Sequence, residues 1–114
     1  MRREVACSEE LTGAQKIWTG YVELDPGAIS AAHHHGEAES SIYIISGHAR
    51  FVAESGTYDA EPGDFVFVPP HLVHVEVNRS TSEPIRMVVS RSTQKALVFN
   101  VDMPPGWAAR AVER

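Results

Sequence analysis

Three histidines in this sequence have a spacing that could hold a metal ion. His33 and His35 are two residues apart, so on a β-strand their imidazole rings leave the same face, while His34 points the other way. His74 lies far along the chain, but an antiparallel sheet can bring it opposite the pair. Neutral imidazoles suit zinc, iron, nickel or copper, and three protein ligands leave open coordination positions. The spacing therefore predicts a site that could polarise an oxygen atom of a bound molecule.

Both histidine groups belong to longer patterns of glycine, proline and carboxylate residues. The first pattern runs over residues 27–47 and consists of Gly27, His33, His34, His35, Glu37, Glu39 and Gly47. The second runs over residues 63–78 and consists of Gly63, Pro69, Pro70, His71, His74 and Asn78. These residues and their spacings resemble the two motifs of the cupin superfamily, except that His71 stands where the second motif usually has glycine.

The resemblance carries expectations for the fold and for the metal. It implies an all-β fold, the double-stranded β-helix or jelly-roll barrel of the cupins, with residues 1–114 forming a single cupin domain. It also implies that one divalent ion is bound by His33, His35 and His74 together with a glutamate. Zinc, iron, nickel and manganese are the candidates for this ion.

The glutamate ligand is where the sequence departs from the cupin pattern. Counting back from Gly47, the position that the family gives to this glutamate holds Ser40. Glu39 keeps an allowed distance from His35, but simple alternation puts its side chain on the opposite face, and a one-residue β-bulge would be needed to turn it inward. Two models follow: a site with three histidines and Glu39, which we prefer, or a three-histidine site with Ser40 facing the ion. Glu37 is a weaker candidate in the loop.

Glu76 is the candidate catalytic residue. Strand alternation puts it on the same face as His74, so its carboxylate should point into the same interior. A carboxylate in an apolar interior is costly unless paired or ligated, and its pKa should rise towards the range useful for proton transfer. The alternative is a surface role, with Glu76 in water at the barrel mouth or paired with Arg86 or Arg91.

Short strands separated by turns make up most of the remaining pattern. Apolar, β-branched and aromatic residues predict strands at 16–24, 42–46, 48–53, 65–69, 71–78, 85–91 and 96–101. Gly47 should close a hairpin between 42–46 and 48–53, and 65–69 should be a buried strand. A short helix could form at 108–114, although such a length is marginal alone.

Composition limits the partners. The 114 residues are 43% hydrophobic and 22% charged, with a net charge of −5, so nucleic acid and anionic membrane surfaces should be repelled. Cys7 is the only cysteine, which excludes an internal disulfide and suits a reducing cytoplasm. We expect no export signal and no membrane span.

The cupin fold hosts unrelated activities, so the function has to be argued from the site. We expect a metal-dependent enzyme acting on a small oxygenated molecule, of the isomerase, lyase, polyketide cyclase or dioxygenase type. A non-catalytic module that binds or senses a small molecule is the alternative. As in similar cupins, we expect a homodimer that pairs through sheet edges and the strand at 16–24.

Overall fold

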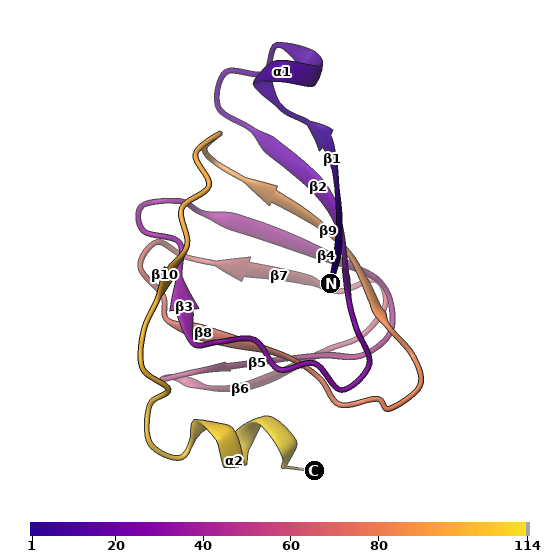
Figure 1. The fold of residues 1–114 in the computed structure, drawn as a ribbon, viewed down its shortest axis with the longest axis vertical. Helices are drawn as coiled ribbons and strands as arrows, with labels where there is room; N and C mark the ends of the chain where they lie inside the picture. The colour runs from indigo at the N-terminus through magenta and orange to yellow at the C-terminus, as the bar shows by residue number, and fades with distance from the viewer. Residues whose placement is uncertain (114) are drawn as a thin grey trace.

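Two antiparallel sheets form the framework of the protein in a computed structural model that describes residues 1–113 (Figure 1). The first sheet has the strand order β1 (Arg2–Cys7), β2 (Trp18–Leu24), β9 (Ile85–Arg91), β4 (Ser40–Ser46) and β7 (Phe65–Val68). The second has the order β10 (Phe99–Asn100), β3 (His33–His34), β8 (His74–Asn78), β5 (Ala49–Ala53) and β6 (Gly56–Ala60). Short helices are α1 (Glu9–Thr12) and α2 (Trp107–Val112). The all-β prediction is confirmed, but in the described residues hydrogen bonding does not close the sheets into a barrel.

The main core lies between the two sheets. Along β4 burial alternates, with Ser40, Ile42 and Ile44 inside and the residues between them exposed, as expected for a strand with one face on the core. Both sheets contribute to this core, with Val22, Leu24, Ile42, Ile44, Ile85, Met87 and Val68 from the first and Ala49, Phe51 and Ala60 from the second. The histidines of β3 and β8 lie beside this apolar layer.

A second apolar cluster fixes the C-terminal segment. The outer face of the second sheet carries Val52, Val75 and Val77, and α2 covers it with Trp107 and Ala111 (Figure 1). This cover explains why β5 is buried on both faces. The helix was expected at 108–114; it spans Trp107–Val112, and Arg114 lies outside the described residues.

Gly47 does not close a hairpin, contrary to the sequence prediction. β4 pairs with β7 and β9 in the first sheet, whereas β5 pairs with β6 and β8 in the second, so the chain crosses between sheets at this glycine. Its φ is 86°, and a Cβ there would lie 2.7 Å from the backbone oxygen of Pro84. Only glycine fits this corner without movement of the neighbouring backbone.

Several strand predictions need correction. β7 is an edge strand of the first sheet. It is not buried as predicted, because Phe65 and Phe67 are 74% and 60% exposed. The predicted strand at 16–24 is interior to its sheet, since β1, which the sequence reading missed, pairs with its outer side. The strand at 85–91 is confirmed, while those at 71–78 and 96–101 shrink to His74–Asn78 and Phe99–Asn100.

No helix in residues 1–113 combines the length and apolar character needed to cross a membrane.

Candidate metal centre

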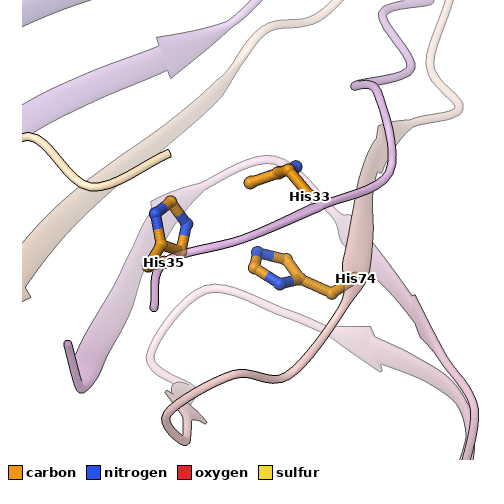
Figure 2. Close-up of side chains that lie close together, drawn as sticks. All are labelled: His33, His35 and His74. Atoms are coloured by element: carbon orange, nitrogen blue, oxygen red, sulfur yellow. The ribbon is translucent and has the colours of Figure 1, made fainter. Parts of the chain in front are cut away.

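The three predicted histidines come together at one point. His33 lies on β3, His35 follows directly after this strand, and His74 begins β8, where it is the register partner of His33. One nitrogen from each ring lies within 4.8 Å of the others. Figure 2 shows the rings gathered between two neighbouring chain segments. This group could hold a metal ion.

Backbone carbonyls fix which nitrogen each ring presents. The Nδ1 atoms of His33 and His35 lie 2.8 Å from the carbonyl oxygens of Ala31 and Leu97, and that of His74 lies 3.0 Å from the oxygen of Leu72. A carbonyl can only accept, so Nδ1 carries the proton and donates, which leaves Nε2 of each neutral ring with a free lone pair. Metal-binding histidines are commonly oriented in this way.

The buried Nε2 atom of His74 makes no hydrogen bond within residues 1–113. The His74 residue itself is 2% exposed, so water cannot freely replace the missing partner. A buried acceptor without a partner is destabilising. An ion held by the three Nε2 atoms would remove this cost, so the residues present fit a divalent metal of the imidazole-binding type.

Glu76 lies next to the histidines, as its position two residues after His74 predicted. One carboxylate oxygen is 3.6 Å from Nε2 of His74, and the side chain is 22% exposed. Burial acts to raise its pKa, but the nearby imidazole of His74, and to a smaller extent the charges of His33 and His35, outweigh it and lower the pKa. Its position in the sequence predicts a raised pKa; the difference arises because Glu76 faces three basic rings rather than an apolar wall.

The pKa values of His35 and His74 shift in opposite directions. Burial lowers the pKa of His35 and so favours the neutral ring that binds metals. Burial also acts to lower the pKa of His74, but the interaction with Glu76 outweighs it and raises that pKa.

A cavity of about 230 Å³ adjoins this group. Its polar lining includes His33, His35, His74, Glu76, Ser40, Ser30, Asn100, Arg3 and Arg91. Apolar side chains of the first sheet complete the wall, among them Ile42, Met87 and Val89. The site is therefore open to a small molecule rather than closed as a structural metal site would be.

Glu39 is not brought into this group. Ser40 is 4% exposed and lines the cavity, whereas Glu39 is exposed and its backbone N–H donates to Ser92. β4 does contain an irregularity, but it falls between Ile44 and Ser46, so it leaves Ser40 inward and Glu39 outward. Glu37 is also exposed. The placement corresponds to the three-histidine alternative with Ser40 facing the site.

For Arg91 the sequence indicates only a possible ion pair with Glu76. It lines the cavity and is 8% exposed, and no ion pair joins it to Glu76 in the described part of the chain. Alternation along β9 could have revealed its orientation, because Ile85, Met87 and Arg91 share the inward face.

The other two histidines nearby lie outside the cluster: His34 stacks on Phe99 with ring centroids 5.0 Å apart, and His71 is exposed.

The fold and the histidine site define a small all-β protein built around a candidate metal centre. The family model described as "Cupin domain" matches residues 20–91, and the chain belongs to this family. No curated protein sequence matches it.

Solved structures resemble the protein over most of its length. A cupin 2 domain-containing protein from Halorhodospira halophila is 22% identical with a TM-score of 0.75, covering 96% of this chain and 74% of its own. A sugar phosphate isomerase of the cupin superfamily from Silicibacter pomeroyi is 24% identical with a TM-score of 0.69, and the match covers 89% of this chain and 66% of the isomerase chain. The polyketide cyclase RemF from Streptomyces resistomycificus is 23% identical with a TM-score of 0.66, and the match covers 82% of this chain and 66% of the cyclase chain. At these identities the likeness establishes the fold alone.

Proposed function

We propose that this cupin is a metal-dependent enzyme that acts on a small oxygenated molecule. The observation that carries the proposal is the convergence of three Nε2 lone pairs on a cavity that also contains a carboxylate. His33, His35 and His74 would hold one divalent ion. When bound, this ion would act as a Lewis acid towards a carbonyl, enol or hydroxyl oxygen of the substrate.

Glu76 is the residue that moves a proton in this proposal. Its carboxylate lies beside the ligand atoms rather than at the protein surface, and its lowered pKa keeps it in the basic form. A substrate oxygen held at the histidines would place an adjacent C–H or O–H group near this base. Ser40 supplies a hydroxyl on the opposite sheet that could orient the same molecule.

Proton transfer next to a polarised oxygen belongs to isomerase, lyase and cyclase chemistry. Similar structures named as a sugar phosphate isomerase and as a polyketide cyclase support these classes. Dioxygenation joins them if the ion is iron. Binding without turnover is the competing function, and the test below separates it from catalysis.

The test is turnover by the metal-loaded protein on a panel of sugar phosphates, 2-hydroxy acids, β-diketones and catechols. We expect turnover of one class, its loss with a chelator and its return with one added divalent ion. Glu76→Gln should keep the ion while kcat falls by about 10²–10⁴-fold, the usual contribution of a general base. Glu37→Gln, which changes an exposed carboxylate of the nearby loop, is the matched control and should leave kcat unchanged.

Two results would contradict this proposal. Saturable binding of a panel member without turnover would indicate a sensing module. Undiminished kcat in Glu76→Gln would remove this residue from the reaction.

A further inference from the structure

Arg91 is a buried cation in the wall of the cavity. It is 8% exposed, and neither a hydrogen bond nor an ion pair joins its guanidinium to any residue in 1–113. Its Nε atom is fully enclosed and unsatisfied. Burying an unpaired charge is among the costliest features a fold can contain, and burial lowers the pKa of this guanidinium.

Arg50 shows how the same protein satisfies a buried arginine when the role is structural. Arg50 is 5% exposed, and it donates Nε to a carboxylate oxygen of Asp59 at 2.7 Å. Further donations reach the other oxygen of Asp59 and the backbone oxygens of Arg110 and Glu113. The absence of such acceptors around Arg91 in the described residues therefore sets it apart.

Packing holds Arg91 in place although no group in residues 1–113 accepts a hydrogen bond from it. Its guanidinium carbon lies 4.5 Å from the centre of the Trp18 ring, a cation–π contact that leaves the N–H groups free. Trp18 in turn lies over Gly20, where a Cβ would be 2.5 Å from the ring. The missing side chain at Gly20 thus makes room for the ring that supports the guanidinium.

The surroundings of Arg91 form an electropositive end of the cavity. Arg91 is the register partner of Ser40 on β4, and the histidines face it from the second sheet. Arg3 also lines this cavity, while among residues 1–113 Glu76 is the only carboxylate in its lining. With a divalent ion at the histidines, positive charge would exceed negative charge, which favours an anionic ligand.

We propose that Arg91 is an anion-binding subsite, and that the molecule bound beside the histidines carries a carboxylate. This inference names the substrate class of the proposed enzyme. It rests on the proposed function only in treating the bound molecule as a substrate. A single guanidinium fork matches the two oxygens of a carboxylate, whereas a phosphate would leave further oxygens without donors. The cavity of about 230 Å³ equals about eight molecules of liquid water at ~30 Å³ each, which suits a small carboxylic acid.

Benzoate and benzamide provide the test, because they share a shape and differ in charge. Their dissociation constants would be measured by calorimetry on the 114-residue protein as purified and after chelator treatment, with inorganic phosphate as a third probe. At about pH 8.5, well above the ordinary histidine pKa of about 6.5, we expect benzoate to bind at least about tenfold tighter than benzamide in both preparations. If chelation abolished the preference, the metal ion would be its cause. That result would overturn the role of Arg91 but would not contradict the proposed enzyme function.

Variants of two arginines on β9 assign the effect. Arg91→Met should abolish the preference for benzoate, and Arg91→Lys, which keeps the charge but not the fork, should reduce it. Arg86→Met is the matched control, since Arg86 is exposed on the same strand and contacts Glu23. Circular dichroism reports whether each variant folds, and the wild-type comparison needs no variant. Equal binding of benzoate and benzamide by the wild type, an unchanged preference in Arg91→Met, or tighter binding of phosphate than of benzoate would each overturn the assignment.

Discussion

At the scale of single residues, the backbone decides what each histidine can do. The carbonyl groups of Ala31, Leu97 and Leu72 each accept a hydrogen bond from a ring Nδ1–H, so the free lone pairs on Nε2 are fixed before any ion binds. The rings therefore lose little rotational freedom on binding, which raises metal affinity.

The orientation of β4 leads to a prediction for the disputed fourth ligand. Because Glu39 points outward, Glu39→Ala should change the metal dissociation constant by less than about twofold, far below the 10–100-fold usual for a residue that supports a metal site. Competition with a chromogenic chelator measures this constant, and His33→Ala is the positive control. A rise of tenfold or more in the metal dissociation constant of Glu39→Ala would mean that the strand changes register when the ion binds.

Residue spacing predicted the histidine group but not everything around it. His33, His35 and His74 could be placed together because alternation and antiparallel pairing are general properties of strands. The orientation of Glu39 depended on where β4 is irregular, which residue types do not reveal. The pKa of Glu76 was predicted in the wrong direction because it depends on three rings whose positions only the fold supplies.

At the scale of elements, strand positions could be predicted better than strand partners. β4 and β9 follow from their patterns of apolar residues, yet Gly47 has a positive φ that serves equally for a hairpin or for a crossing between sheets. The choice depends on contacts with Pro84 and Ile85, which are distant in sequence. β1 was missed because nearly all of it is exposed, so it has no buried face to leave a pattern.

The attachment of α2 gives a pH-dependent prediction. Arg50 links β5 to Asp59 on β6 and to backbone oxygens at the end of α2. The hydrogen bond from Arg50 lowers the pKa of Asp59, so the folded state binds its proton less readily than the unfolded state does. The stabilisation is thus present above the unfolded pKa of about 3.9 and is lost as pH falls through the lower folded value.

Asp59→Asn should therefore reduce the free energy of unfolding by about 1 kcal/mol at pH 7, a modest value because Asp59 is largely exposed and screened by solvent. Urea unfolding of both proteins between about pH 7 and pH 3 measures the difference, which should shrink at the acid end of that range. Glu54→Gln, at an exposed turn, is the control and should change little. A difference that stays constant through the acid range would rule out the ion pair as its cause.

At the scale of the whole molecule, exposed edges and apolar side chains lead us to propose a homodimer. β1 and β7 are the edges of the first sheet, and open edges favour pairing with another chain. Next to β7, the outer face carries exposed Tyr43, Ile45, Phe65 and Phe67. Such a cluster is larger than isolated surface apolar residues and is typical of an interface.

Light scattering after size exclusion tests the assembly at micromolar concentration. We expect a mass of twice the 12.5 kDa chain, and Phe67→Asp should shift it towards the monomer because a charge cannot be buried there without cost. Glu61→Asp, at an exposed turn just before β7, is the control. A wild-type mass of one chain would contradict the proposal.

The metal content of the purified protein tests the central claim most directly. Elemental analysis of the wild type, after exposure to divalent ions and removal of excess, should find about one ion per chain, since one group of three converging histidines is present in residues 1–113. His74→Ala should fall below about one tenth of this occupancy, because two imidazoles hold an ion weakly, while His34→Ala, whose ring lies outside the group, should keep it. A wild type without stoichiometric metal, or a His74→Ala variant with full occupancy, would contradict the account.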